Sequence, residues 1–437
     1  MIIFTKRILS INVPDIELPR IVIIGSGFAG LKLAQKINSR LYQIVLLDKN
    51  NFHTFQPLMY QVASAGLEPD SIVYPIRKIF KGKNHFHFRM ASVESVDEEA
   101  NKIETNIGPI HYDHLVIATG AKTNFFGLKN VEEFAYSMKS IQESLDLRSI
   151  ILQNFENALN TKDKKIQEAY MNFVIVGAGA TGVELAGALA ELKEKILPKD
   201  YPDLNINLMK IHLIQSSDKV LGGMSENASN KSLQFLKEFG INIHLNTFVK
   251  DYDGLTVHTS EGPMQSKTVI WSAGVKGAPI KNIKGKLSPS KRIVTDVFNR
   301  VINSSNVYAI GDVSIIDSVN NQQGHAMLGS VAGQQGAHLG KNFNAIAKGK
   351  EMTPFKYKDR GTMATIGRNK AVVDLPFYKF SGIIAWFVWM FLHLMLLVDF
   401  RNRLIVFMNW TWSYFKYDKG LRLIIRKVDK REITTKQ

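Results

Sequence analysis

Cysteine is absent from the 437 residues of the sequence. This absence excludes disulfide bonds, zinc or iron–sulfur centres held by cysteine, and any catalytic thiol. It also excludes every enzyme whose redox chemistry depends on an active-site disulfide. It carries no information about the compartment, because cytosolic proteins need no disulfides either.

Acidic residues are few compared with basic ones: 39 Asp and Glu stand against 55 Lys and Arg, a formal net charge of +16. Most of this excess lies in residues 341–437, which hold 19 basic and 7 acidic residues together with four of the five tryptophans. A basic, Trp-rich segment is compatible with nucleic-acid binding. Basic residues next to Trp and long apolar runs favour a membrane interface instead. We therefore expect a membrane partner and no nucleic acid.

Residues 380–398 contain no Asp, Glu, Lys or Arg. These 19 residues approach the roughly 20 that a membrane-spanning helix needs. The next apolar run, Leu404–Phe415, has 12 residues and is too short to return across a bilayer. We expect peripheral insertion of amphipathic helices, with spanning as the alternative, and we expect His393 to be a packing residue rather than a proton relay. The basic residues expected at anionic headgroups are Arg401, Arg403, Lys416, Lys419 and Arg422.

A glycine-rich turn follows the apolar run that begins at Arg20 and has the spacing Gly25, Gly27, Gly30. A strand, this turn and a helix form a dinucleotide-binding unit: the first glycine allows the turn, the second lets the pyrophosphate approach, and the third lets helix and strand pack closely. The helix N-terminus offers amide donors to the phosphates. Asp48 lies 23 residues after Gly25, at the end of the next strand, where a carboxylate accepts ribose hydroxyls.

A second turn of the same kind has Gly177, Gly179 and Gly182. Strand register puts Gln215 where the first unit has its acid. A carboxylate there would repel the 2′-phosphate of NADPH, whereas an amide can donate a hydrogen bond to it. We therefore expect this site to use NADH and to tolerate NADPH, the alternative being that Gln215 is only a polar strand end.

Both units close with a strand and a small-residue turn, at Gly120 and at Gly274. The two glycine turns are 152 residues apart and the two closing turns 154. Between them, both halves show short alternating strands, at His85–Val96 with Lys102–Asn106 and at Asn242–Phe248 with Leu255–His258. Similar parts in the same order at nearly one offset indicate two copies of one dinucleotide-binding domain. The fold class is therefore α/β, with two Rossmann-like domains, the second inserted into the first, and C-terminal amphipathic helices.

Two acidic residues stand out beside these turns. Glu184 follows Gly182 by two residues, and we expect it in the first turn of the helix. A carboxylate there suits the helix dipole, but it is unusual beside a polyanion unless it meets the nicotinamide end. Asp312 ends the segment Ala309–Asp312 and is suited to a ribityl hydroxyl of FAD, with the following helix aimed at the flavin.

Several longer segments carry a resemblance to one family: Asn51–Leu67, Ile117–Ala121, Gly179–Gly187, Val269–Val275, Tyr308–Asp312, Val331–Gly336, Asp359–Arg368 and Phe400–Gly420. With the two glycine turns, they make the chain resemble the type II NADH:quinone oxidoreductases, the single-subunit, non-proton-pumping NADH dehydrogenases. The resemblance covers about Arg20 to Leu423. It implies FAD in the first domain, NADH in the second, monotopic membrane attachment on the cytoplasmic face of a bacterial cell membrane, and a homodimer.

The same resemblance implies a quinone site on the helix around Gln334 and Gln335, either of which can hydrogen-bond a quinone carbonyl. Glu184 would then lie near flavin, nicotinamide and quinone as a proton relay. The chain departs from the family pattern at Gly329-Ser330, where relatives often have Ala-Gln, which leaves the quinone orientation open. No metal is required.

The expected domains are residues 19–125 and 293–376 for FAD, 126–292 for the nicotinamide nucleotide, and 377–437 for membrane attachment. The expected cofactor-binding residues are Gly25, Gly27, Phe28, Ala29, Gly30, Asp48, Lys49, Gln56, Val93, Ala118, Thr119, Gly120, Gly177, Gly179, Ala180, Thr181, Gly182, Gln215, Ala273, Gly274, Gly311 and Asp312. Two other functions remain open at this point. One is a cysteine-free reductase of a ferredoxin- or rubredoxin-type carrier, and the other is a non-catalytic, NADH-sensing membrane protein.

Overall fold

The structure, a computed structural model, describes residues 12–317, 324–416, 421–424 and 426–428. Its contacts form two compact units. Unit 1 holds residues 1–53, 74–122 and 275–358, and unit 2 holds residues 54–73, 123–274 and 359–437. The domain boundaries expected from the sequence remain predictions, and Lys419 lies outside the described residues.

Unit 1 is built on a five-stranded parallel sheet with the order β20-β9-β1-β2-β5. Its strands are β1 (Arg20–Ile24), β2 (Gln43–Asp48), β5 (Phe86–Met90), β9 (His114–Ile117) and β20 (Val307–Ala309). In the central strand β1, the four residues after Arg20 are all apolar and buried. Such an unbroken apolar run is typical of a parallel strand covered on both faces.

The other elements of unit 1 surround this sheet. An antiparallel sheet joins β6 (Val93–Asp97), β7 (Lys102–Thr105) and β8 (Ile110–His111), and a parallel pair joins β19 (Ile293–Thr295) and β21 (Ser314–Ile316). The remaining elements are α1 (Phe28–Lys36), α4 (Ile76–Ile79), β18 (Val275–Gly277), η3 (Gly311–Val313) and α11 (Gly329–Ile346). The chain passes between the units at β3 (Phe52–Thr54), β4 (Val73–Pro75) and β10 (Ala121–Thr123), and again before Val275 and after Lys358.

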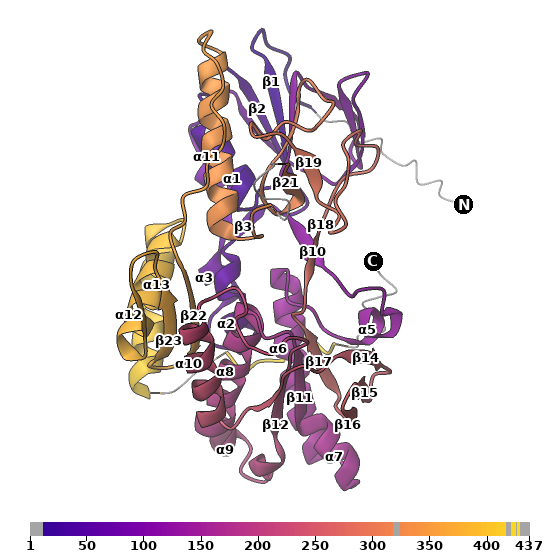
Figure 1. The fold of residues 1–437 in the computed structure, drawn as a ribbon, viewed down its shortest axis with the longest axis vertical. Coiled ribbons are helices and arrows are strands. Elements are labelled where there is room, and N and C mark those ends of the chain that lie inside the picture. The colour runs from indigo at the N-terminus through magenta and orange to yellow at the C-terminus, as the bar shows by residue number, and fades with distance from the viewer. Residues whose placement is uncertain (1–11, 318–323, 417–420, 425, 429–437) are drawn as a thin grey trace, which may run out of the picture. The chain divides into compact units, whose positions relative to one another are not determined.

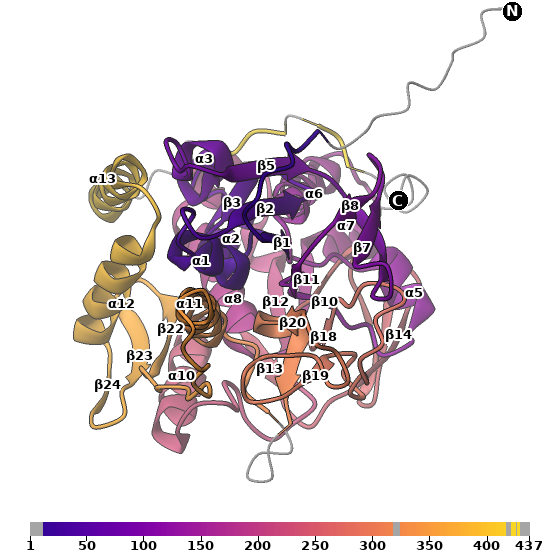
Figure 2. The same ribbon diagram turned by 90° about the horizontal axis from the view of Figure 1, so that it is seen from above.

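Helices α1 and α11 lie side by side in unit 1 (Figures 1 and 2). Glycine makes this approach possible: a Cβ atom on Gly336 would stand 2.1 Å from the carbonyl oxygen of Ala29, and one on Gly340 would stand 2.8 Å from the Cβ atom of Lys36. The backbones of the two helices are therefore in direct contact at Gly336.

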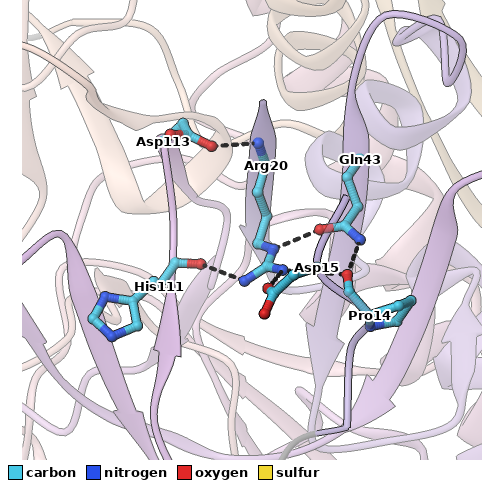
Figure 3. Close-up of polar contacts among 6 residues, drawn as sticks. All are labelled: Pro14, Asp15, Arg20, Gln43, His111 and Asp113. Atoms are coloured by element: carbon cyan, nitrogen blue, oxygen red, sulfur yellow. Dashed lines mark hydrogen bonds and ion pairs between the residues drawn. The ribbon is translucent and has the colours of Figure 1, made fainter. Parts of the chain in front are cut away.

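At the amino ends of the parallel strands, Arg20 connects several segments of unit 1 (Figure 3). Its backbone N–H donates to Asp113 at 2.6 Å, and its Nε donates to the Gln43 side chain at 2.5 Å. The Gln43 amide in turn donates to the carbonyl of Pro14 at 2.6 Å. The ion pair of Arg20 with Asp15 adds little, because the Asp15 side chain is 96% exposed. Gln43, itself bonded to Arg20, thus holds the segment before β1 to the sheet, at the edge opposite the glycine turn.

Unit 2 repeats this topology with a four-stranded parallel sheet in the order β13-β12-β11-β17. Its strands are β11 (Asn172–Val176), β12 (Lys210–Ile214), β13 (Asn242–His244) and β17 (Thr268–Trp271). An antiparallel sheet of β14 (Val249–Tyr252), β15 (Thr256–Thr259) and β16 (Gly262–Gln265) corresponds to β6-β7-β8. The duplicated α/β fold expected from the sequence is confirmed.

The helices of unit 2 before its C-terminal part include two long ones, α6 (Ile141–Leu159) and α8 (Ala180–Lys195). The shorter ones are η1 (Gln56–Leu58), α2 (Met59–Ala63), α3 (Pro69–Ile72), α5 (Lys129–Phe134), α7 (Lys164–Met171), α9 (Leu197–Asp200), η2 (Ile206–Leu208) and α10 (Glu226–Glu238). A capping box formed by Ser140 and Glu143 fixes the start of α6.

The short strands expected between each glycine turn and its closing turn are present, and the structure shows with which neighbours they pair. The segment His85–Val96 contains β5, which joins the parallel sheet, and the start of β6, which joins the antiparallel one. Likewise β13 extends the parallel sheet of unit 2, and the antiparallel sheet begins at β14. Alternation along a short segment does not show with which neighbour a strand pairs.

The C-terminal part of unit 2 begins with an antiparallel sheet of β22 (Thr362–Gly367), β23 (Lys370–Asp374) and β24 (Lys379–Ser381). Helix α12 (Ile383–Leu396) lies beside β23 and β24, and α13 (Phe400–Lys416) follows it (Figure 2). The uncharged run 380–398 thus forms a helix of 14 residues, about 21 Å long. Among the described residues no helix has the length and hydropathy to cross a bilayer.

The contact of α1 with α11 predicts a contrast between two glycines of α11. Gly336→Ala forces a Cβ atom into the Ala29 carbonyl and should destabilise the protein by about 2 kcal/mol or more. Gly333→Ala is the matched control, since no atom lies within 4 Å of its added Cβ, and it should stabilise the helix by up to about 1 kcal/mol. Thermal unfolding of both holoproteins measures the difference. Equal melting temperatures would contradict the contact.

Candidate active site

The glycine turn of unit 1 brings β1, α1 and the loop after β9 together. Gly25 has φ +102°, and a Cβ atom there would stand 2.4 Å from the carbonyl oxygen of Ala118. A Cβ atom on Gly30 would stand 1.9 Å from the carbonyl oxygen of Gly25, so α1 begins in backbone contact with the strand end. Gly27, in contrast, is exposed and has open space around it. These three environments match the three roles expected from the spacing.

Asp48 is fixed against this turn by hydrogen bonds. One carboxylate oxygen accepts the backbone N–H of Ser26 at 2.6 Å and its hydroxyl at 2.7 Å. The other accepts the N–H of Asn50 at 2.8 Å. A carboxylate has about four acceptor positions, so Asp48 is held in place and keeps acceptor capacity for a hydroxyl group.

The turn of unit 2 is built in the same way. A Cβ atom on Gly182 would stand 1.9 Å from the carbonyl oxygen of Gly177, and one on Gly177 would stand 2.7 Å from the backbone nitrogen of Ala273. The N–H of Gly177 donates to Ile214 at 2.8 Å, as that of Gly25 donates to Leu47. The closing turns at Ala118 and Ala273 therefore support the two glycine turns equivalently.

Gln215 stands opposite Gly177 as Asp48 stands opposite Gly25. Its side-chain oxygen accepts the N–H of Ala178 at 2.8 Å, the counterpart of the bond from Ser26 to Asp48. Its amide nitrogen donates to Ser217 at 2.7 Å. The register therefore puts a neutral amide at the position where unit 1 has a carboxylate.

Both turns fit the phosphates of a dinucleotide. Helices α1 and α8 begin after Gly27 and Gly179, and neither helix start has a side-chain cap. The first N–H groups of each helix therefore remain for an anion, and no Cβ atom fills the space in front of them. Ala180 and Thr181 are exposed in the first turn of α8.

The remaining expected cofactor residues lie in different settings. Thr119 donates from its hydroxyl to the carbonyl of Ala278 at 2.7 Å. The ring of Phe28 packs edge-on against His53 with 5.4 Å between the centroids. Lys49 is exposed after β2, Val93 begins β6, Gln56 begins η1 in unit 2, and Gly120 and Gly274 have φ angles of +71° and +76°.

No long helix follows Asp312 directly, and its expected contact with FAD stays a prediction. The element that holds it is the short 3-10 turn η3, which leads into β21, and the long helix α11 begins only at Gly329. Gly311 nevertheless connects this turn to α11, because its N–H donates to the Gln335 side chain at 2.7 Å. The connection is thus made by a hydrogen bond rather than by the chain itself.

Gln334 and Gln335 differ in their surroundings. Gln335 is buried, and its oxygen is occupied by Gly311. Gln334 uses both ends of its amide on the backbone of Lys358: the nitrogen donates to the carbonyl at 2.9 Å, and the oxygen accepts the N–H at 3.1 Å.

Glu184 lies in the second turn of α8, so the expected placement in the first turn was wrong and the alternative reading, a residue that only suits the helix dipole, loses its support. Its side chain is buried, and this burial raises its pKa to about 8. The N–H of Thr365, 3.5 Å from the carboxyl, and the nearby indole of Trp389 oppose the shift. Because the pKa lies above 7, Glu184 is mostly protonated at neutral pH.

Glu184 faces a cavity of about 110 Å³ within unit 2. The cavity is lined from five elements, and its polar or aromatic lining includes Tyr60, Gln61, Glu184, Glu191, Thr365, Arg368, Trp389, Trp410 and Tyr414. Gln61 connects two other lining residues, Tyr60 and Trp410. Its side-chain nitrogen donates to the Tyr60 hydroxyl at 2.9 Å, and its side-chain oxygen accepts the Trp410 indole N–H at 2.8 Å. Burial, and to a smaller extent the nearby carboxyl group of Glu184, raises the pKa of Tyr60 well above its ordinary value. The Tyr60 hydroxyl therefore stays protonated.

Gly187 was not identified from the sequence, although it positions this cavity. A Cβ atom on it would stand 1.6 Å from the carbonyl oxygen of Ile366, so α8 and β22 touch backbone to backbone. The neighbouring Thr365 is thereby brought to Glu184. The only sequence signal was the glycine at the end of the segment Gly179–Gly187.

Helix α13 is attached to unit 2 by polar side chains. The amide of Asn402 lies 3.2 Å from the carbonyl oxygens of Asp70, Ser71 and Val73, and Asn409 donates to Glu68 at 2.7 Å. In α12, His393 stacks on Trp389 with 4.1 Å between the centroids, and burial lowers its pKa to about 4. A neutral, stacked His393 agrees with the packing role expected for it.

Residues 19–336 match the family described as pyridine nucleotide-disulphide oxidoreductase, and residues 360–416 match the NDH2 C-terminal domain. The fold and the two dinucleotide turns thus define a flavoprotein oxidoreductase of this class. The chain is 32% identical over 420 residues to the type II NADH:quinone oxidoreductase Ndh of Mycobacterium tuberculosis, covering 92% of this chain and 89% of the relative. It is 27% identical to the type II enzyme of Staphylococcus haemolyticus over 81% of this chain and 89% of the relative. The chain belongs to the type II NADH:quinone oxidoreductases.

Solved structures agree on the fold. NDH2 from Plasmodium falciparum, solved in complex with NADH, has a TM-score of 0.86 at 23% identity and matches 93% of this chain and 100% of its own. The sulfide:quinone oxidoreductase of Aquifex aeolicus has a TM-score of 0.70 at 19% identity, covering 92% of this chain and 96% of its own. The C-terminal match separates this chain from reductases of soluble carriers that share the fold.

The amide at Gln215 predicts weak discrimination between NADH and NADPH. The ratio of their kcat/KM values should stay below about 10³, since a larger ratio needs a repulsive contact of about 4 kcal/mol. Gln215→Glu should raise the ratio about 10- to 100-fold, because a charge then faces the 2′-phosphate. Gln265→Glu, at an exposed position of β16, is the control. An unchanged ratio in Gln215→Glu would show that Gln215 does not face the ribose.

Proposed function

We propose that Glu184, in its cavity, holds and delivers a proton for quinone reduction. The chain is an FAD-dependent oxidoreductase that oxidises NADH and reduces a quinone without pumping protons. Bound FAD supplies the redox chemistry, accepting hydride from NADH and passing two electrons on to the quinone. The reduced quinone takes up two protons, so a buried proton donor has a task in this reaction.

The burial of Glu184 beside a cavity, which raises its pKa to about 8, supports the proposal most directly. A group whose pKa lies near the working pH can both release and regain a proton, which is the best condition for acid–base catalysis. A carboxyl group of ordinary pKa would already be ionised at pH 7. The cavity gives the carboxyl a place to meet a polar ligand or a chain of water molecules.

We assign the first glycine turn, with Asp48 and the expected residues around it, to FAD, and the second, with Gln215, to NADH. For the quinone carbonyl we favour Gln335 over Gln334. Because Gly311 fixes the oxygen of the Gln335 amide, the NH2 end has a defined orientation as a donor. Gln334 must first give up its two bonds to Lys358.

We also propose that α12 and α13 attach the protein to a membrane, on the cytoplasmic face of a bacterial cell membrane. Large apolar side chains are exposed along both helices, among them Ile384, Phe387, Phe391, Met395, Leu404, Met408 and Phe415. Contiguous exposed apolar surface of this kind marks an interaction site, and a quinone substrate is dissolved in the bilayer. The homodimer remains a prediction from the resemblance.

Replacing Glu184 by Gln separates the two half-reactions. NADH should still bleach the bound flavin at a rate close to that of the wild type, while recolouring by a water-soluble quinone should slow by about 100-fold, as expected for loss of a general acid. Stopped-flow absorbance of the holoenzyme measures both steps. Glu194→Gln, exposed on the same helix, is the control. Equal slowing of both steps, or of neither, would rule out the proposed role.

The raised pKa also predicts a pH dependence of stability. The folded protein holds the Glu184 proton up to about pH 8, whereas the unfolded chain loses it near the ordinary glutamate pKa of 4.5. Stability should therefore fall as pH rises between these two values. In Glu184→Gln this fall should be absent, so the variant should gain melting temperature over the wild type at pH 9 and little at pH 5. If the difference in melting temperature between the variant and the wild type were the same at pH 5 and pH 9, Glu184 would not be buried and protonated.

The membrane proposal predicts unequal effects of two exposed phenylalanines. Phe391→Ser, on α12 where the ring is 62% exposed, should weaken binding to lipid vesicles by about tenfold, since a buried aromatic ring contributes about 1.5 kcal/mol or more. Phe248→Ser removes a ring that is 58% exposed elsewhere in unit 2 and should leave binding unchanged. Vesicle flotation measures both. Equal losses would contradict attachment through α12.

A further inference from the structure

A second cavity of unit 2 lies where the C-terminal end of α13 meets the C-terminal end of α8 and helix α9. Its volume is about 370 Å³. Its charged and aromatic lining residues are Lys195, Lys199, Asp200, Trp412, Lys416 and Arg422. The reaction described above uses none of the residues from α9, Lys416 or Arg422.

The charge of this cavity is positive. Four basic side chains stand against one acid, Asp200; Arg422 is paired with Asp200 and Lys195 with Glu194. The pair of Arg422 with Asp200 connects the segment after α13 to α9. Lys199 and Lys416 come from separate helices and are exposed to solvent. An anion in the cavity would therefore meet lysines from both sides, whereas a cation would be repelled.

An apolar stripe along α13 leads to this cavity. Leu404, Met408, Trp412 and Phe415 follow one another at helical spacings of four, four and three residues, and all four are exposed. Side chains at such spacings lie on one face of a helix. Trp412, 60% exposed, belongs both to this stripe and to the cavity. An apolar face therefore ends at a basic cavity, with an aromatic residue of the type that is enriched at membrane interfaces between them.

We propose that this cavity binds the phosphate of an anionic phospholipid, whose acyl chains lie along the stripe on α13. Free phosphate would use the lysines but not the stripe, and a neutral lipid would use the stripe but not the lysines. Only a molecule with an anionic head and apolar chains matches both. The site rests on the proposed membrane attachment and makes it specific for one lipid class.

The test uses full-length, FAD-loaded protein and two kinds of vesicle, phosphatidylcholine alone and an equal mixture of phosphatidylcholine and phosphatidylglycerol. Lys199→Gln combined with Lys416→Gln should weaken binding to the anionic vesicles about 30-fold, at about 1 kcal/mol for each lysine. Binding to the neutral vesicles should not change. Lys164→Gln combined with Lys165→Gln removes the same charge from exposed positions on α7 outside the cavity lining and should cost less than about threefold. The flavin spectrum and circular dichroism confirm that each variant is folded.

Four other results would overturn the proposed lipid site. The affinity for anionic vesicles could fall equally in the two double variants, or stay at the wild-type value in Lys199→Gln/Lys416→Gln. Either result would mean that diffuse electrostatic attraction, and not the cavity, binds the anionic lipid. Release of the wild type by inorganic phosphate, but not by chloride at the same ionic strength, would assign the cavity to free phosphate. A wild type that binds neither vesicle overturns membrane attachment and the site together. Quinone reductase activity is measured separately, on wild-type protein with a water-soluble quinone and no vesicles, so its failure would count against the proposed function and not against the lipid site.

Discussion

The contact of helix backbone with strand backbone at the two glycine turns is the constraint on which the rest of the molecule depends. At Gly30 and at Gly182, a Cβ atom would stand 1.9 Å from the carbonyl oxygen of the first glycine of the turn. Only hydrogen in place of a side chain permits this approach, and the approach aims the start of α1 or α8 at the carboxyl ends of the strands. The amide donors of both helices are thereby placed where the phosphates of a dinucleotide bind. Gly187, about one and a half turns further along α8, allows the same close approach and brings β22 against the helix.

The burial of Glu184 follows from this packing and has a thermodynamic consequence. A carboxyl group placed among α8, β22 and α12 loses its hydration, and the resulting pKa of about 8 means that the folded state favours the neutral acid. Above that pH the protein must either bury a charge or open. A carboxyl group that lowers stability in this way, next to a cavity, is typical of a functional site, because a purely structural role would be served equally well by glutamine.

The C-terminal helices α12 and α13 also line the cavity of Glu184. Trp389, Trp410 and Tyr414 line the cavity of Glu184, while other residues of the same two helices present apolar side chains to the outside. Asn402 and Asn409 fix α13 to the segment that holds α2 and α3. Trp410 also donates to Gln61, so two of the segments that carry the family resemblance contact each other.

The sequence by itself determined the two dinucleotide turns, the duplicated fold, the exclusion of thiol chemistry and the family, because glycine spacings, apolar runs and a missing residue type are local or compositional properties. It did not determine how Glu184 is buried, that Gln335 is bound to Gly311, that Gly187 touches Ile366, or that β5 and β13 join the parallel sheets. Each of these depends on residues brought together from distant parts of the chain, as Thr365 is brought to Glu184 across 181 positions. Burial and hydrogen-bond partners exist only once the chain has folded. For this reason the sequence pointed to Glu184 as a candidate, and only the tertiary structure showed it to be a buried acid that holds its proton at neutral pH.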